Sequence, residues 1–388
     1  FGVLIVNNVP FHGNQTITPY WPDGLINPKL SWEETKQFDA GLDLEFFGNR
    51  LSFELDYYYR YTDKLLAQVT LPGDYNAYIS QWQNAYAISN QGIELQIKAD
   101  FVRSEKLHWD FSFNIARNWN RFEKSNNGMD FTNLASKHNL NIIGKPLNGI
   151  YVYNDQGYYN SQDEVPLYYV NGRRKYLSSL GNQIYTPGDR RIQDVDGNGQ
   201  VATMVPLLED RVYGGSPLPL AFGGIATTLK WKGIDVNLLF SYKLGRHVLN
   251  AGRGASVGTI LRANTAEMMV PILADLDKVS FWQKPGDNTD FPINELENGK
   301  NNFATNLKSN VEKINYLKLK SISIGYTLPV FPKQSKHYAR VFMSVENVFT
   351  ITNSSSPDPE SIDIVTGVDS NNNYPLATRY TLGLTLNL

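Results

Sequence analysis

The feature that most constrains this chain is an alternation of apolar and polar residues that recurs along its whole length. Ile93, Leu95 and Ile97, for example, are separated by Glu94 and Gln96. Because successive side chains of a strand point to opposite faces, this period predicts strands with one apolar and one polar face. The pattern predicts strands of one antiparallel sheet at 39–47, 51–61, 92–101, 107–117, 225–231, 234–243 and 378–388.

Strand length and the placement of aromatic residues favour a membrane barrel over a soluble two-sheet sandwich, which would show the same alternation. The segments run for about ten residues, as a tilted membrane strand requires. Tyrosine and tryptophan lie near the strand ends, where an aromatic girdle would sit, at Tyr57, Tyr59, Trp119 and Trp231. We therefore expect an all-β, antiparallel transmembrane β-barrel, with apolar side chains such as Leu95 facing lipid.

The spacing between the strands supports the same prediction. Gly48-Asn49 and Lys232-Gly233 form tight turns, whereas 121–220 and 246–312 are long and rich in Asn, Gly, Asp and Pro. Barrels of the outer membrane have short periplasmic turns and long outer loops. We expect one barrel domain over 1–388, with those two long segments on the outer face.

Composition excludes several other classes of protein. Aromatic residues make up 13% and charged residues 19%, the latter below the roughly 25% of soluble domains. The net charge of −2 offers no basic field for nucleic acid, and the lack of cysteine excludes thiol chemistry. No apolar run reaches the 18 or so residues of a membrane helix, and a mean hydropathy of −0.36 leaves a barrel as the membrane fold. The start at Phe1, without a signal peptide, indicates a piece of a longer protein.

Two local departures from the pattern carry structural predictions. The apolar parity switches between Leu319 and Ile322, which predicts a β-bulge or a rim there. Residues 259–270 have the composition of a short helix within a loop.

Catalytic and metal-binding motifs are weak. Residues 254–258 match the G-x-S-x-G nucleophile elbow, but a polar loop precedes them and His337 is the only later histidine, so a glycine-rich loop is the better interpretation. The five histidines share no metal-ligand spacing: His12, His108, His138, His247 and His337. We expect no enzymatic activity and no resident cofactor. Loop aromatics could stack on sugars or peptides, although singly they more often pack within loops: Trp82, Tyr158, Tyr159 and Trp282.

The sharpest local motif is the segment 194–199, Asp-Val-Asp-Gly-Asn-Gly. It begins like an EF-hand loop, with oxygen ligands at Asp194, Asp196 and Asn198, but Val205 stands where that loop requires a bidentate Glu. A turn built from Asp, Asn and Gly is one explanation. The other is a calcium site at Asp194, Asp196 and Asn198, completed by Glu209 or Asp210.

A series of motifs resembles the SusC/RagA-type TonB-dependent transporters of Bacteroidetes. The segment 27–35 is similar to that family's N-P-x-L-x-W-E-x-T, 90–95 to its N-x-G-[IV]-E motif, and 188–211 to its "GD…D-x-N-G-D-G…DR" block, with Asp196 and Asn198 exchanged. Further matches in family order are 214–219, 231–235, 316–320, 325–329, 346–350, 357–360 and 374–388. The terminal Leu388 replaces the usual Phe.

The resemblance implies the C-terminal half of a barrel of roughly 22 strands, with the plug domain and TonB box N-terminal to this segment. It implies TonB-dependent import of a bulky nutrient, oligosaccharide or peptide, across the bacterial outer membrane. The implied partners are a SusD-like surface lipoprotein, TonB-ExbB-ExbD through the missing N-terminal part, and outer-membrane lipid, with no nucleic acid. A structural, SusC-like scaffold in a larger envelope complex is the alternative, and a soluble β-sandwich hydrolase lacks any strong carboxylate-pair motif.

Overall fold

The computed structural model describes the chain from Leu4 to Asn387 in part; nothing is described at 1–3, 7–8, 12–14, 18–19, 23–25, 71–79, 126–130, 133–137, 171, 180–181, 202–209, 253–279, 294–305, 330–337, 371–373 and 388. The predicted helix at 259–270, the elbow motif at 254–258 and Leu388 lie outside the described residues. In the described part, no helix is both long enough and apolar enough to cross a membrane.

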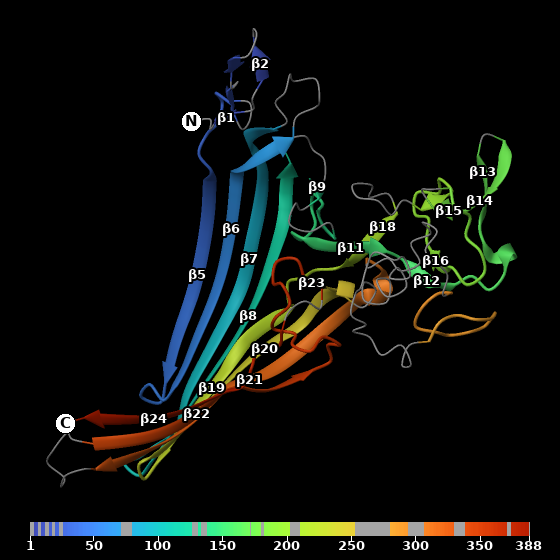
Figure 1. Ribbon diagram of the computed structural model, residues 1–388. Helices are drawn as coiled ribbons and strands as arrows, with labels where there is room; N and C mark the ends of the chain where they lie inside the picture. The colour runs from blue at the N-terminus through green and yellow to red at the C-terminus, as the bar shows by residue number, and fades with distance from the viewer. Residues whose placement is uncertain are drawn as a thin grey trace.

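One large antiparallel sheet dominates the fold (Figure 1). Its neighbours run in the order β24-β22-β21-β20-β19-β8-β7-β6-β5. The strands are β5 (Glu34–Phe46), β6 (Leu51–Thr70), β7 (Ser80–Arg103), β8 (Leu107–Ser125), β19 (Ala221–Trp231), β20 (Ile234–Asn250), β21 (Val311–Pro329), β22 (Tyr338–Thr352) and β24 (Arg379–Asn387). Each predicted strand is confirmed, and most are longer than the pattern indicated, because the alternation weakens toward the strand ends.

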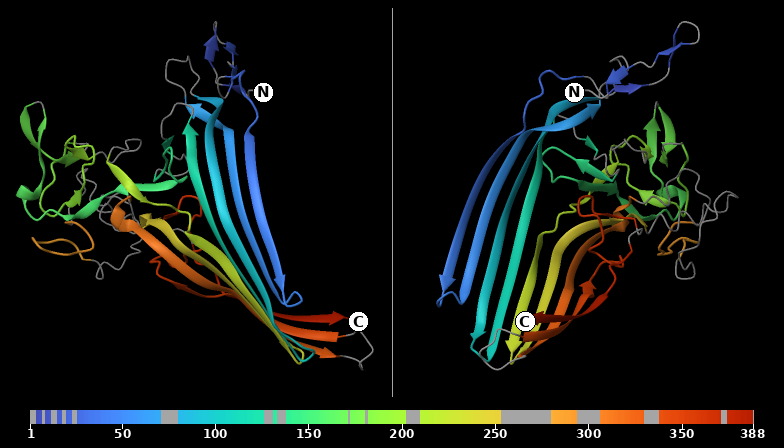
Figure 2. Two further views of the ribbon diagram at one scale, coloured as in Figure 1. Left: turned by 180° about the vertical axis from the view of Figure 1, so that it is seen from behind. Right: turned by 60° about the vertical axis from the view of Figure 1, so that its left-hand side comes forward.

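The strand register keeps apolar and polar residues on opposite faces across the sheet. One row of cross-strand partners is Leu44, Phe53, Ile97, Phe113, Ile225, Phe240, Leu319 and Phe349, and a neighbouring row is Glu45, Ser52, Lys98 and Ser112. Side chains of the apolar face stay substantially exposed, including Leu44 at 40%, Ile93 at 44% and Phe349 at 46%. Figure 2 shows that this single layer curves like part of a barrel wall.

The predicted bulge is present where the parity switches. Relative to β20, the register shifts between Leu319 and Ser321, which leaves Lys320 as the extra residue. Relative to β22, the same place is irregular, and Asn347 there has a φ of 53°. The inserted residue keeps Leu319 and Ile322 on the same apolar face although their sequence spacing is odd.

Connections are short at one end of the sheet and long at the other. The turns at 47–50, 104–106 and 232–233 lie at the first end. Lys232 and Gly233 both have positive φ, 47° and 85°, as a tight hairpin turn requires. The opposite end carries the connections 71–79, 126–220, 251–310 and 353–378. We refer below to the short-turn end and the long-connection end.

The connection 126–220 folds into small sheets that the alternation did not predict. A four-stranded sheet has the order β18-β11-β10-β9, and the pairs are β12-β16, β13-β14 and the parallel β15-β17. These strands are β9 (Phe131–Thr132), β10 (Asn139–Asn141), β11 (Gly149–Tyr153), β12 (Asp155–Tyr158), β13 (Leu167–Val170), β14 (Arg173–Tyr176), β15 (Ser178–Ser179), β16 (Arg190–Ile192), β17 (Gln200–Val201) and β18 (Arg211–Gly215). Shorter elements are β1 (Leu4–Val6) with β4 (Tyr20–Pro22), β2 (Val9–Phe11) with β3 (Gln15–Ile17), β23 (Val368–Asp369) on β20, and the 3-10 turns η1 (Gln162–Glu164) and η3 (Lys308–Asn310).

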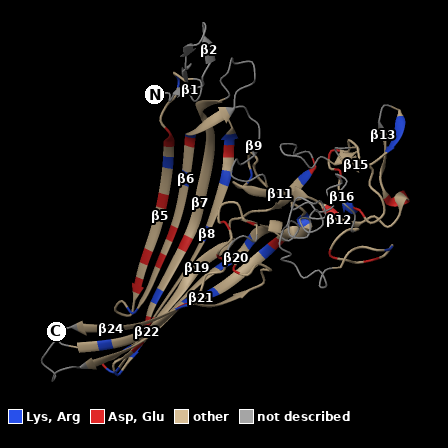
Figure 3. Ribbon diagram, viewed as in Figure 1, with Lys and Arg blue, Asp and Glu red and all other residues tan. Residues whose placement is uncertain are grey.

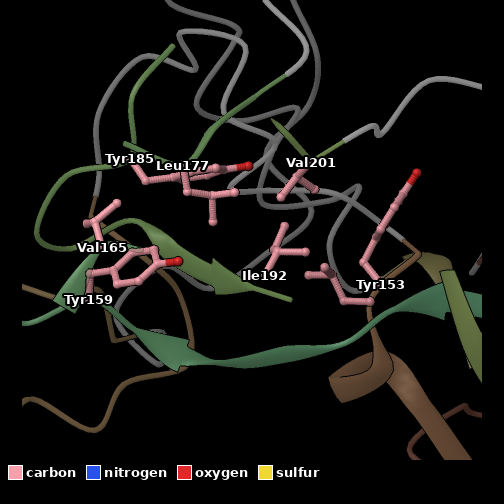
Figure 4. Close-up of a cluster of buried hydrophobic side chains, with 8 residues drawn as sticks. Tyr153, Tyr159, Val165, Leu177, Tyr185, Ile192 and Val201 are labelled. Carbon is pink, nitrogen blue, oxygen red and sulfur yellow. The ribbon is translucent and has the colours of Figure 1, made fainter. Parts of the chain in front are cut away.

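A buried cluster holds this connection together (Figure 4). It comprises Tyr153, Tyr159, Val165, Leu177, Tyr185, Ile192, Val201 and Leu307. Five of the eight positions lie outside the small strands, and one of these, Leu307, comes from the connection 251–310, so the core could not follow from strand periodicity alone. The connection is therefore a packed unit and not an open loop.

Candidate functional site

The polar face of the large sheet carries charged side chains on several neighbouring strands. Lys98 Nζ lies 2.9 Å from Glu54 Oε1, and both side chains are largely exposed. Directly opposed positions on neighbouring strands also include like-charged residues, such as Asp43 with Glu54 and Asp56 with Glu94. Figure 3 shows the acidic positions along β5, β6 and β7. Such pairs are tolerated where water screens them, so this face is suited to an aqueous interior.

The segment 353–369, which we call the strap, crosses the polar face of β20 and β21. Lys318 Nζ lies 3.1 Å from Asp358 Oδ2 and 3.0 Å from Glu360 Oε2. Lys320 Nζ lies 2.8 Å from Glu360 Oε1. The Lys318 and Asp358 side chains are 3% and 6% exposed, so this pair is shielded from solvent, whereas Glu360 and Lys320 are partly exposed. Two motifs that are 40 residues apart in sequence thus fix the strap to the wall.

A buried arginine anchors the other side of the strap. Arg246, 1% exposed, donates through Nε to the Pro217 carbonyl at 3.0 Å and through its terminal nitrogens to the carbonyls of Ile362 and Asp363. The strap also adds β23 to β20, with Leu249 paired to Val368. A guanidinium offers five donors in a fixed plane, which suits it to hold several carbonyls at once.

At neutral pH the carboxyl groups of Asp358 and Glu360 are ionised, which favours their ion pairs with Lys318 and Lys320. Burial alone would raise the pKa of the Asp358 carboxyl, but the Glu360 and Leu376 backbone N–H groups and the Lys318 ammonium outweigh burial and lower it. The pKa of Glu360 is also lowered, because its two lysine partners outweigh its burial. Both carboxylates are therefore charged well below neutral pH.

The segment 194–199 forms a compact turn. Asp194 accepts hydrogen bonds from Gly197 N at 2.8 Å and Gly199 N at 2.9 Å. Carboxylate oxygens of Asp194, Asp196 and Asp210 come within 4.8 Å of one another, and Asp210 also accepts a bond from Val195 N at 2.9 Å. Of the two completing residues considered from the sequence, Asp210 is the one brought to the turn, and Glu209 lies outside the described residues.

Asn198 lies in the same turn, but its side-chain amide donates a hydrogen bond to a carboxylate instead of presenting its oxygen. Its Nδ2 donates to Asp196 Oδ2 at 2.7 Å, while its side-chain oxygen accepts from Gln200 N at 2.7 Å. Burial and the neighbouring Asp194 carboxylate raise the pKa of Tyr168 to about 12. The turn therefore concentrates negative charge, which a divalent cation would neutralise.

A cavity of about 500 Å³ lies among the long connections. A buried ion pair lines the cavity: Arg190 Nη1 lies 2.9 Å from Asp155 Oδ2. The Arg190 guanidinium is 5.4 Å from the Tyr158 ring centroid. Polar groups of Asn160, Asp287 and Thr289 also line the cavity. Its size and mixed lining suit a small polar group such as part of a sugar or peptide.

The loop aromatics considered from the sequence divide into two groups. Tyr159 and Trp282 are buried, 1% and 6% exposed, so they pack within the connections and are not available for stacking. Trp82 is 53% exposed, and Tyr158 is half-buried at the cavity. His138 is buried, His108 and His247 are half-buried, and His12 and His337 lie outside the described side chains.

Comparison with known proteins identifies the fold. The sequence profile described as "TonB dependent receptor-like, beta-barrel" matches residues 5–252, more than half of the chain. The chain belongs to this family. Its strand pattern, short turns and long connections are thus those of a TonB-dependent receptor barrel.

Curated relatives of this TonB-dependent receptor barrel match nearly all of the chain. The TonB-dependent receptor P3 of Formosa agariphila is 29% identical over 96% of this chain and 36% of its own length. The TonB-dependent receptor SusC of Bacteroides thetaiotaomicron is 24% identical over 93% of this chain and 32% of its own length. The chain therefore spans about a third of the length of these relatives.

Solved structures show the same fold. The RagAB peptide transporter matches with a TM-score of 0.69 at 22% identity, covering 99% of this chain and 38% of the other. The RagAB peptide importer in its closed-closed state matches with a TM-score of 0.67 at 24% identity, with 100% and 38% covered. These likenesses confirm a partial barrel of this type.

The ion-pair network of the strap was not predicted. The motifs 316–320 and 357–360 supported the family resemblance, but nothing in them indicated that they contact each other. The available signal was the pair of lysines at Lys318 and Lys320, two positions apart and therefore on one face, in a strand that otherwise alternates with apolar residues.

Proposed function

We propose that this chain is the C-terminal barrel part of an outer-membrane transporter that imports a bulky oligosaccharide or peptide in a TonB-dependent manner. The observation that carries the proposal is the single-layer sheet with an exposed apolar face and an opposite face that carries charged side chains. An apolar face of this extent is stable against lipid, and closed sheets are one of two backbone solutions there. The polar face and the strap would then border the passage.

The coupling and the partner follow from the family and from the relatives. SusC and RagAB are a TonB-dependent receptor and a peptide transporter by name, and both resemble this chain over nearly its full length. We propose that TonB-ExbB-ExbD energises the intact protein through segments outside these residues. A SusD-like lipoprotein would cover the long-connection end, where the packed unit 126–220 lies.

The test is uptake and partner recovery with the full-length protein in its native bacterium. Deleting the gene should abolish energised uptake of one class of oligosaccharide or peptide, and affinity purification should recover a surface lipoprotein. Replacing 126–220 with a short Gly-Ser linker should lose the lipoprotein while the barrel still shows heat-modifiable migration on gels. Unchanged uptake after deletion would favour the scaffold role, and purification without any lipoprotein would contradict the proposed partner.

We also propose that Asp194, Asp196 and Asn198, with Asp210, hold calcium and stabilise the long-connection end. The support is the approach of three carboxylates around a turn whose backbone N–H groups donate a hydrogen bond to each of them. In this arrangement the Asn198 amide would rotate to present its oxygen to the ion, or remain a partner of Asp196.

We predict that Asp194→Asn weakens calcium binding by about tenfold or more, because a carboxylate ligand becomes neutral while the size is kept. Isothermal titration of the full-length protein in detergent measures the affinity. Asp163→Asn, in η1 of the same connection, is the matched control and should leave the affinity unchanged. Equal affinities of wild type and Asp194→Asn would retire the site.

A further inference from the structure

The short-turn end of the sheet carries a cavity that the proposed transport does not use. It has a volume of about 630 Å³ and lies between the turns 104–106 and 232–233 and the ends of β21 and β22. Figure 1 shows these turns grouped at one end of the sheet, far from the long connections. This cavity is therefore separate from the strap, from the turn 194–199 and from the cavity among the long connections.

Cations outnumber available anions around this cavity. Its lining includes Lys106, Lys230 and Lys232, together with Glu105 and the Asp235–Arg340 pair. Figure 3 shows the basic positions at this tip of the sheet.

The carboxylate of Asp235 is already neutralised. Arg340 binds it with two nitrogens, Nε to Oδ1 at 3.0 Å and Nη2 to Oδ2 at 2.5 Å. Arg340 is thus the main charge partner of Asp235, and the opposing Lys230 interacts with Asp235 more weakly. Among the described residues, no carboxylate oxygen lies within 4.0 Å of the ammonium groups of Lys106, Lys230 or Lys232.

The lysines come from two adjacent turns, at Lys106 and Lys232, and from the end of β19, at Lys230. Lys230 pairs across the strands with His108 and Asp235 in a polar row, whereas Trp231 pairs with Leu107 and Ile234 in the adjacent apolar row. The turn lysine Lys232 places its Nζ 5.0 Å from the Trp231 ring centroid. An anion at this rim would thus meet lysines beside an exposed tryptophan.

We propose that this cavity binds a phosphate group. Three ammonium groups with one neighbouring carboxylate repel one another, and a tetrahedral dianion or monoanion relieves that repulsion while accepting several N–H bonds. The lipid headgroup and free inorganic phosphate share this chemistry. The exposed Trp231, 49% accessible, favours a headgroup, because tryptophan prefers the boundary between lipid and water.

The headgroup source rests on the proposed membrane location, whereas the phosphate site itself does not. Native mass spectrometry of the full-length protein in neutral detergent measures retained phosphatidylglycerol and phosphatidylcholine, and titration calorimetry measures inorganic phosphate. The test variant is K106Q/K230Q/K232Q, and K106R/K230R/K232R keeps the charge. The matched control is K29Q/K284Q/K308Q, three lysines at the long-connection end.

The expected result is that the glutamine variant binds phosphatidylglycerol about tenfold or more weakly, while the arginine variant and the control bind like wild type. If the protein prefers phosphatidylglycerol to inorganic phosphate, the ligand is a lipid headgroup. If millimolar inorganic phosphate displaces phosphatidylglycerol, the ligand is free phosphate. Wild-type binding by the glutamine variant, an equal loss in the control, or no binding of either probe overturns the site. Unchanged uptake after deletion of the gene, together with phosphate binding by the purified protein, would contradict the transport proposal and leave the phosphate site standing.

Discussion

Replacing Asp358 with Ala should destabilise the folded full-length barrel by about 3 kcal/mol, the typical result of removing one partner from a buried ion pair. Lys318, 3% exposed, would keep only Glu360, which it shares with Lys320. The backbone N–H groups of Glu360 and Leu376 would also lose their acceptor. Chemical unfolding in detergent, followed by tryptophan fluorescence, measures the free energy of unfolding.

An exposed ion pair on the same face provides the control. Glu54→Ala removes the partner of Lys98, but both side chains are over a third exposed, so the effect should stay below about 1 kcal/mol. A second test is the double variant Lys318→Met with Asp358→Leu, which should recover much of the loss because no buried charge remains unpaired. Equal effects of Asp358→Ala and Glu54→Ala would contradict a shielded network.

The same network should make stability depend on acid. The pKa values of Asp358 and Glu360 are lower in the folded protein than their ordinary values of 3.8 and 4.5. Their contribution is therefore complete above those ordinary values and is lost as the pH falls through the folded values. Between neutral pH and about pH 5 the strap should contribute a constant stability, and Asp358→Ala should reduce the acid dependence below that range.

The large sheet could be predicted from the sequence because its rule is local. Parity alone places Leu95 and Ile97 on one face and Glu94 and Lys98 on the other, and the register confirms it. Even the bulge at Lys320 followed from the parity switch between Leu319 and Ile322. A two-residue period can be read without knowing which strands are neighbours.

Contacts made across long sequence separations could not be predicted in this way. Alternation places Lys318 on the polar face but does not say that Asp358 lies opposite it. Likewise, nothing in the sequence near Arg246 shows that the carbonyls of Pro217 and Ile362 meet it. The short strands of 126–220 have too few residues for a period, so their core depends on tertiary packing. The turn 194–199 could be predicted in part. Asp194, Asp196 and Asn198 are close in sequence, whereas Asp210 reaches the turn from a distance.

Replacing Leu382 with Arg should reduce the folded, membrane-inserted full-length protein by about tenfold or more. Leu382 lies on the edge strand β24, opposite Met343, and is 79% exposed on the apolar face. A lipid-facing Arg costs about 2–4 kcal/mol near the middle of the bilayer and less near its boundaries. Heat-modifiable migration and protease resistance of the outer-membrane fraction measure the folded amount.

Thr381→Arg is the matched control, because Thr381 pairs with Ser344 on the polar face one residue away. The same charge there would meet water, so assembly should remain near the wild-type level.

The strand β24 lies at an edge of the sheet. The described sheet ends at β24 on one side and at β5 on the other, so each of these strands has one neighbouring strand. We expect a strand outside these residues to pair with the free side of β24 and close the barrel, since closure is what removes an unpaired edge from lipid. Equal assembly of the Leu382 and Thr381 variants would show that the apolar face of β24 does not meet lipid, and the barrel assignment of this edge would then be wrong.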